Sequence, residues 1–205
     1  MINYLTFGIV LGLSAGLAPG PLMTLVISET LQHNIKSGLK VAIAPIITDF
    51  PIIFLTLLIL GKLSHFHQVL GGVSIVGGML VFLMGIDNLK TRGIEINFQA
   101  VKAKSLSKGI LVNLLNPAPY LFWISVGAPA ITKAAAISYP TAISFLLSFY
   151  VLLVGSKMSV GILVGKSKSF LTGNIYIYTM KILGISLLVM ALFLIYDGLK
   201  LLNIM

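Results

Sequence analysis

Two ionisable side chains, Asp49 and Lys157, lie well inside long apolar stretches of this 205-residue chain. An acid at the centre of a membrane-spanning helix costs on the order of 3 kcal/mol on insertion scales, so such residues usually serve a function or have a partner. Asp49 could bind an ammonium group, carry a proton, or do both. Its alternative role is a structural ion pair with Lys157, which could also extend its amine toward the membrane surface.

Two other apolar stretches are each interrupted by a proline pair, Pro19-Gly20-Pro21 and Pro117-Ala118-Pro119. Proline lacks a backbone donor and breaks a helix. A helix that restarts there presents free N–H groups and the positive end of its dipole, which can hold a carboxylate. Asn113 and Asn116 would add donors or acceptors beside the second pair. A structural kink is the alternative, but breaks in corresponding places of two half-chains favour a binding site.

The elements that carry these residues are predicted to be membrane helices. Hydrophobic residues make up 58% of the chain and charged residues 9%, which indicates an all-α integral membrane protein. Six apolar segments approach the roughly 20 residues that a spanning helix needs, and together they form a single transmembrane domain over residues 1–205. These segments are Tyr4–Ser28, Leu39–Leu60, Val69–Ile86, Ile110–Ile131, Pro140–Val164 and Met180–Leu202.

The basic residues predict the orientation. Ten Lys or Arg residues fall in the connections after segments one, three and five, and three fall on the opposite side, with Lys157 left out of the count. Because cytoplasmic loops of membrane proteins are rich in Lys and Arg, both termini are predicted to lie outside, with a basic cytoplasmic loop over residues 88–108. The net charge of +9 is thereby explained without a nucleic-acid partner.

Two inverted repeats are predicted, one over about residues 1–90 and one over about 108–205. Segments three and six end alike, in Asp87-Asn88-Leu89-Lys90 and Asp197-Gly198-Leu199-Lys200. Segments one and four share the proline pair. Three crossings per repeat make the second repeat enter from the opposite face, so the two are related by a pseudo-two-fold axis in the membrane plane. Chance similarity of short apolar motifs is the alternative.

Glycines recur every four residues from Gly8 to Gly20 and predict a close helix-packing surface, either within the bundle or between the protomers of a possible homodimer. Glu29, near Lys36 at the cytoplasmic end of segment one, is interpreted mainly as a solvated end residue, with lining of the entry as the alternative. Trp123, Tyr120 and Phe122 follow the second proline pair, where they could face a ligand or pack on neighbouring helices.

Signatures of catalysis are missing from the sequence, so an enzyme is not predicted. Gly165-Lys166-Ser167 resembles the end of a nucleotide-binding loop, but Val160 stands where that loop needs glycine. The chain has no Cys, which excludes disulfides and Cys-ligated metals. We therefore expect neither a cofactor nor a bound metal.

Two runs resemble the signatures of the LysE/RhtB-type amino-acid exporters. Gly16-Leu17-Ala18-Pro19-Gly20-Pro21 is similar to the first-helix signature of that family, and the run from Gly109 to Phe122 is similar to the second. Asp49 matches a position where the family often carries an acid, whereas Ala118 stands where it often has Lys. The resemblance implies a plasma-membrane secondary exporter of amino acids or related small metabolites, driven by proton antiport.

Two other functions are compatible with the residues. A cation or metal-ion permease of similar architecture would need several oxygen ligands, for which the apolar segments offer Asp49, Asn113 and Asn116. A membrane protein without transport activity would leave the paired proline breaks unexplained. A mostly neutral site suits small or hydrophobic amino acids, and the single acid also suits a basic one.

Overall fold

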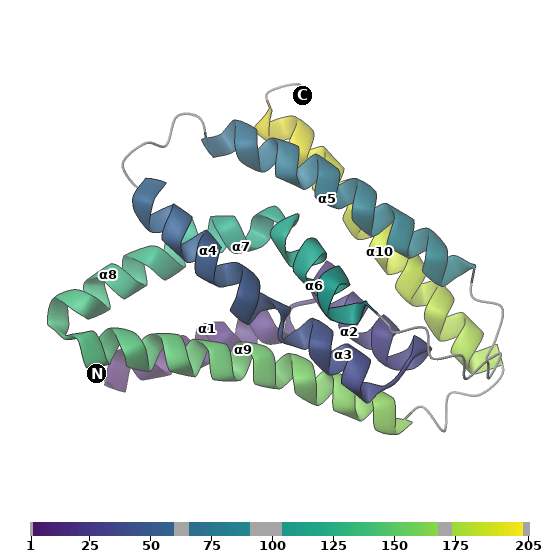
Figure 1. Cartoon of the computed structure of the whole chain (residues 1–205), viewed down its shortest axis with the longest axis horizontal. Helices are drawn as coiled ribbons and strands as arrows, with labels where there is room; N and C mark the ends of the chain where they lie inside the picture. The colour runs from purple at the N-terminus through teal and green to yellow at the C-terminus, as the bar shows by residue number, and fades with distance from the viewer. Residues whose placement is uncertain (1, 60–65, 91–103, 168–173, 203–205) are drawn as a thin grey trace.

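The computed structural model describes residues 2–59, 66–90, 104–167 and 174–202, which are almost entirely helical and include no strand (Figure 1). The helices of the first half are α1 (Ile2–Leu17), α2 (Pro21–Gln32), α3 (Ile35–Ala42), α4 (Ala44–Ile59) and α5 (Phe66–Leu89). Those of the second half are α6 (Ser105–Leu114), α7 (Pro117–Phe122), the π-helix η2 (Trp123–Gly127), α8 (Ala128–Ile137), α9 (Tyr139–Ser167) and α10 (Asn174–Leu201). The all-α class predicted from the sequence is confirmed.

Four helical stretches of the described residues are long and apolar enough to cross a membrane. They are Ile35–Thr56, Pro117–Ile137, Tyr139–Ser167 and Ile177–Leu201. The bent pair of α1 and α2 makes a fifth if it is counted as one span. Helix α5 has 24 residues, and its part from Ser74 to Leu89 forms a shorter apolar helix. The structure thus shows a multi-span architecture, and the count of six crossings stays a prediction.

Both predicted helix breaks are present. Helix α1 ends at Leu17 and α2 begins at Pro21, with a bend of 60° between them. In the second half the break lies at Leu115 and Asn116, between α6 and α7. The predicted segment Ile110–Ile131 therefore does not form one helix. Because proline fits the first position of a helix, Pro117 starts the new helix instead of interrupting a continuous one.

Two pairs of long helices flank the breaks. Helix α1 packs along α9, and α5 packs along α10. In Figure 1 these pairs lie on opposite sides of the molecule, and α2, α3, α4, α6 and α7 lie between them. The central basic loop predicted over residues 88–108 falls mostly on residues 91–103, which lie outside the described part of the chain.

The glycines of α1 form the predicted packing surface, and the structure uses it within the chain. Gly8, Gly12 and Gly16 are buried against α9, where a Cβ at Gly12 would lie 3.0 Å from that of Leu152. Gly20 has no atom within 4 Å of the place where a Cβ would stand. A homodimer stays a prediction, and it would need a surface other than the one formed by Gly8, Gly12 and Gly16.

Helices α5 and α10 run antiparallel with small residues facing each other every seven positions, which is two helical turns. The facing pairs are Gly71 with Gly198, Gly78 with Ala191, and Gly85 with Gly184. A Cβ at the α5 glycine of each pair would lie 2.9–3.0 Å from the carbonyl oxygen of its α10 partner. The two backbones are therefore in direct contact, as small residues allow in membrane helices.

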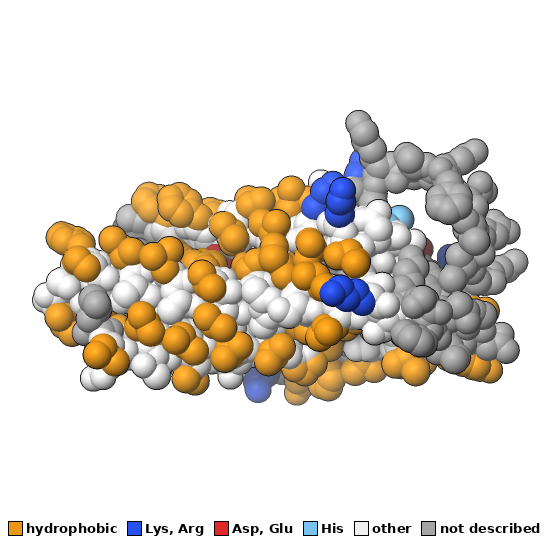
Figure 2. All heavy atoms as spheres, turned by 90° about the horizontal axis from the view of Figure 1, so that it is seen from below, with side chains coloured by type: hydrophobic (Ala, Val, Ile, Leu, Met, Phe, Trp, Pro, Cys, Tyr) orange, Lys and Arg blue, Asp and Glu red, His pale blue; other side chains and the backbone are white. Residues whose placement is uncertain are grey.

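Large apolar side chains point outward from the bundle. Phe50 and Leu147 are 75% and 61% exposed, for example. In Figure 2 hydrophobic side chains are spread over the described part of the visible face, and a few Lys or Arg side chains lie among them toward one end. Such a surface is suited to lipid, where apolar side chains need no burial in protein.

We predict that Gly78→Leu destabilises the α5–α10 pair by about 1–3 kcal/mol, because the new side chain would be forced against the facing backbone. A Cβ at Gly78 already lies 2.6 Å from Ile195 and 3.0 Å from the carbonyl oxygen of Ala191. Gly72→Leu is the matched control, since no atom lies within 4 Å of a Cβ there. Thermal unfolding in detergent measures both, and equal stability of the two variants would contradict the prediction.

Candidate functional site

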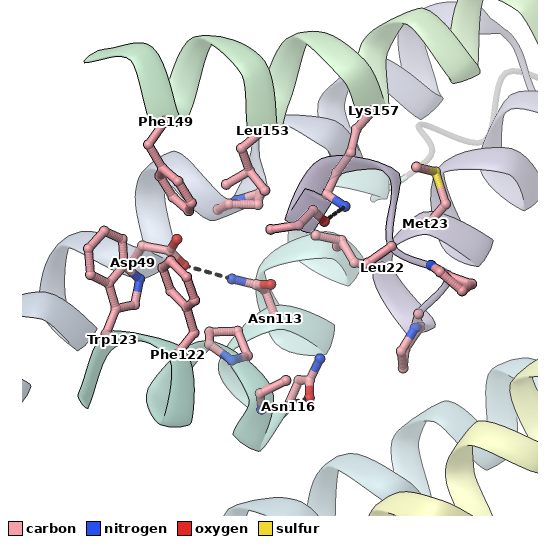
Figure 3. A pocket seen from close by; sticks show the side chains of 18 residues that line it. Leu22, Met23, Asp49, Asn113, Asn116, Phe122, Trp123, Phe149, Leu153 and Lys157 are labelled. Carbon is pink, nitrogen blue, oxygen red and sulfur yellow. Dashed lines mark hydrogen bonds between the residues drawn. The ribbon is translucent and has the colours of Figure 1, made fainter. Parts of the chain in front are cut away.

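A cavity of about 320 Å³ lies where the two helix breaks approach each other (Figure 3). Its polar lining residues are Asp49, Asn113, Asn116 and Lys157. The first break contributes Pro19, Gly20, Pro21, Leu22 and Met23, and the second contributes Ala118 and Pro119. Seven of the eight predicted site residues therefore line one cavity. The eighth, Pro117, starts α7 and is buried outside this lining.

Asp49 lies on α4 and is 4% exposed. Asn113 on α6 donates a hydrogen bond of 3.1 Å to its Oδ1, and Tyr150 on α9 donates a longer one of 3.4 Å to its Oδ2. Trp123 of η2 is a further side-chain hydrogen-bond partner. Four elements thus hold this carboxylate. Each of these partners is a neutral hydrogen-bond donor, and together they orient the carboxylate at the cavity.

Asn113 connects the acid to the backbone of α4. Its Nδ2 atom also donates to Thr48 Oγ1 at 2.6 Å, and that hydroxyl donates to the carbonyl of Ala44 at 3.0 Å. Asn113 is 4% exposed, so both of its amide hydrogens are used in a buried network. This network fixes the distance between α4 and α6 at the cavity.

Lys157 on α9 does not pair with Asp49, although the sequence left that ion pair open as its structural role. Its Nζ atom donates to the carbonyl oxygens of Ala15 and Gly16, at 3.2 and 3.0 Å, and the side chain is 5% exposed. These carbonyls belong to the last turn of α1. The last four carbonyls of a helix have no partner within it, and a cation there complements the dipole. Lys157 is therefore the cap of the broken helix.

The second break is capped by a neutral side chain. Tyr120 donates its hydroxyl to the carbonyl of Leu114, at the end of α6, at 2.9 Å. Asn116 accepts from the N–H of Ala118 at 3.0 Å and so caps the start of α7. We expected this start to be a second seat for an anion. The cap corrects that expectation, because Asn116 occupies one of the N–H groups that an anion would use.

The start of α2 is open by comparison. Gly20 precedes it with extended backbone and no side-chain cap. Among the described residues, the N–H groups of Leu22 and Met23 have no hydrogen-bond partner. Both residues line the cavity. The first break thus offers free N–H groups and the positive end of a helix dipole, which can bind a carboxylate.

Aromatic rings form the wall on the Asp49 side of the cavity. Phe122 stacks on Phe149 with ring centroids 5.2 Å apart, and Trp123 meets both rings edge-on. Gly127 makes room for this indole, since a Cβ there would collide with the ring of Trp123. The sequence left open whether these aromatic residues face a ligand or pack. Phe122 and Trp123 line the cavity and also pack on a neighbouring helix, whereas Tyr120 caps the break.

Tyr150 and Thr48 were missed by the sequence analysis. Tyr150 precedes Lys157 by seven residues, so the two share one face of α9, and this spacing could have identified it. Nothing comparable distinguishes Thr48 from other threonines in apolar segments.

Glu29 is not the solvated end residue that we predicted. It lies on α2, is 1% exposed and faces the start of α6. Ser105 and Lys108 reach its carboxylate oxygens at 2.6 Å each. A carboxylate near a predicted membrane boundary is expected to meet water. Here the start of α6 covers it, which the sequence of the first segment alone does not indicate.

The family model of the LysE type translocators matches residues 13–198. The chain belongs to this family. No curated protein and no solved structure matches it significantly. The match covers both breaks, Asp49 and Lys157, and identifies the chain as a membrane translocator, which agrees with its apolar multi-span architecture.

We predict that Lys157→Met destabilises the translocator by about 1–3 kcal/mol, because it leaves two carbonyls at the end of α1 without their donor. Asp49→Asn added to Lys157→Met should not restore the loss, since the two residues form no direct ion pair. The coupling energy of the double-mutant cycle should stay well below the roughly 3–5 kcal/mol that breaking a buried ion pair costs. Thermal unfolding of the four proteins tests this, and recovery in the double variant would show a direct pair.

Proposed function

We propose that this protein is a secondary exporter of amino acids or closely related small metabolites in the plasma membrane, working by proton antiport. The observation that carries the proposal is a single cavity lined by both a buried carboxylate, Asp49, and the uncapped N-terminus of α2. An amino acid carries an ammonium group and a carboxylate. The two features match these groups in charge, and the apolar wall of Phe122, Trp123 and Phe149 suits its side chain.

Proton antiport follows if a proton and the ammonium group of the substrate bind to the same carboxylate. Asp49 is the carboxylate in the described lining of the cavity. A proton and a substrate ammonium group would compete for it, so release of one accompanies binding of the other. Protons entering down their gradient would then displace the amino acid on the outer side.

We also propose six crossings built from two inverted repeats, with both termini outside. The register of α5 against α10 supports the repeat, because these helices end the two halves and face each other through matched small residues. The two breaks, each with its carbonyls capped by a side chain, support it as well. The 10-to-3 distribution of basic residues supports the orientation.

The test is efflux from proteoliposomes loaded with radiolabelled amino acids, with and without a pH gradient. We expect Asp49→Asn to insert normally and to lose gradient-driven efflux by about tenfold to a hundredfold, the loss expected when a charged hydrogen-bonding partner is removed. Asp87→Asn is the control, because that acid is exposed and lies outside the cavity.

Three other results would contradict the proposal. Unchanged efflux in Asp49→Asn would show that the acid does not couple transport to protons. Efflux of a divalent cation such as Mn²⁺, without efflux of any amino acid, would support a cation permease instead. No efflux of either kind would favour a function other than transport.

Topology is predicted separately. Lys104→Cys and Lys133→Cys place single thiols at exposed positions before α6 and in α8 of a chain that has no natural Cys. With six crossings, a membrane-impermeant maleimide should label the first from the cytoplasmic face and the second from the outer face of the membrane. Labelling of both from the same face would rule out a crossing between them.

A further inference from the structure

Glu29, Ser105 and Lys108 form a buried charged contact outside the lining of the cavity. Ser105 Oγ donates to Glu29 Oε2, and Lys108 Nζ lies against Oε1, each at 2.6 Å. His33, one helical turn after Glu29, also faces the carboxylate with its Nε2 3.6 Å from Oε2. The Lys108 side chain is 41% exposed, whereas Glu29 is almost fully covered. The contact therefore extends from the protein interior to its surface.

The contact lies at a fixed distance from the cavity along both helices that it joins. Glu29 follows Pro21 by eight residues on α2, and Ser105 precedes Asn113 by eight residues on α6. Both Pro21 and Asn113 line the cavity. Eight residues of helix correspond to about 12 Å. The two half-helices are thus joined at their far ends, on the side that the basic residues predict to be cytoplasmic.

Among the described residues, ion pairs are present at the α2–α6 end of the bundle only. Both ion pairs among the described residues involve Glu29. The position that corresponds to Glu29 in the second repeat, eight residues after Pro119, is Gly127, which carries no charge. Helices α2 and α6 pack together, whereas α1 and α7 share few contacts among the described residues.

We infer that Glu29, Ser105 and Lys108 are the cytoplasmic gate of the transport pathway, closed in this structure. The inference rests on the proposed export function, since an exported amino acid must enter the cavity from the cytoplasm. Opening requires α2 and α6 to separate, which breaks two hydrogen bonds to a carboxylate. Water and Lys108 can solvate the carboxylate once it is exposed, so the closed and open states can both be populated.

The test measures access to the cavity and does not depend on the substrate. Ala118→Cys places a single thiol in the cavity lining, next to the second break. A membrane-impermeant maleimide is applied to the cytoplasmic face in inside-out vesicles. We expect Glu29→Gln to raise the labelling rate about tenfold, because the neutral amide loses the charged hydrogen bonds. Lys108→Met should act likewise because it leaves Glu29 without its cation, and the half-exposed side chain can be replaced without leaving a cavity in the core.

Asp87→Asn is the matched control, since it removes an exposed acid on the same predicted side, and it should leave the rate unchanged. Exchanging the charges, with Glu29→Lys and Lys108→Glu together, should restore slow labelling. Unchanged cytoplasmic rates in both Glu29→Gln and Lys108→Met, with the thiol still reactive from the outer face, would overturn the gate and leave the export function standing. Faster labelling in a protein that transports no amino acid would support the gate and overturn the export function.

Discussion

The structure depends on one constraint: backbone groups freed by a helix break inside a membrane must find partners other than lipid. Each break frees carbonyls before it and N–H groups after it. Lys157 donates hydrogen bonds to carbonyls at the end of α1, and Tyr120 donates one to the last carbonyl of α6. Asn116 accepts a hydrogen bond from an N–H group of α7. The N–H groups of α2 are the set left to the cavity, so the place where a ligand can bind is defined by what the protein itself has not satisfied.

The same constraint separates the two buried charges. A cation and an acid in a low-dielectric interior attract strongly, and a direct pair would satisfy both. Here Lys157 donates its hydrogen bonds to the last turn of α1, and Asp49 is held by Asn113, Tyr150 and Trp123. Keeping them apart leaves the carboxylate with neutral donors only. The carboxylate lines the cavity with no Lys or Arg of the described residues bonded to it.

Much of this arrangement could be predicted from the sequence, and the reasons differ by residue. The proline pairs locate both breaks because proline acts on its own helix. Asp49 and Lys157 stand out because charge is rare in apolar segments. The expectations that the structure corrects concern contacts between elements far apart in the chain. The burial of Glu29 is due to α6, which begins 76 residues later in the chain, and the cap of α1 is due to α9. Local patterns carry no information about such partners.

The two caps differ in charge, since Lys157 is a cation and Tyr120 is neutral, so an electric field across the membrane acts on them differently. A lysine amine that moved across the whole membrane would gain or lose about 2.3 kcal/mol per 100 mV, whereas a phenol hydroxyl would be nearly indifferent. A motion that releases Ala15 and Gly16 from Lys157 displaces a charge, whereas release of Leu114 from Tyr120 displaces none. Membrane voltage therefore acts on the cap of the first break, which α9 supplies, more than on the cap of the second break.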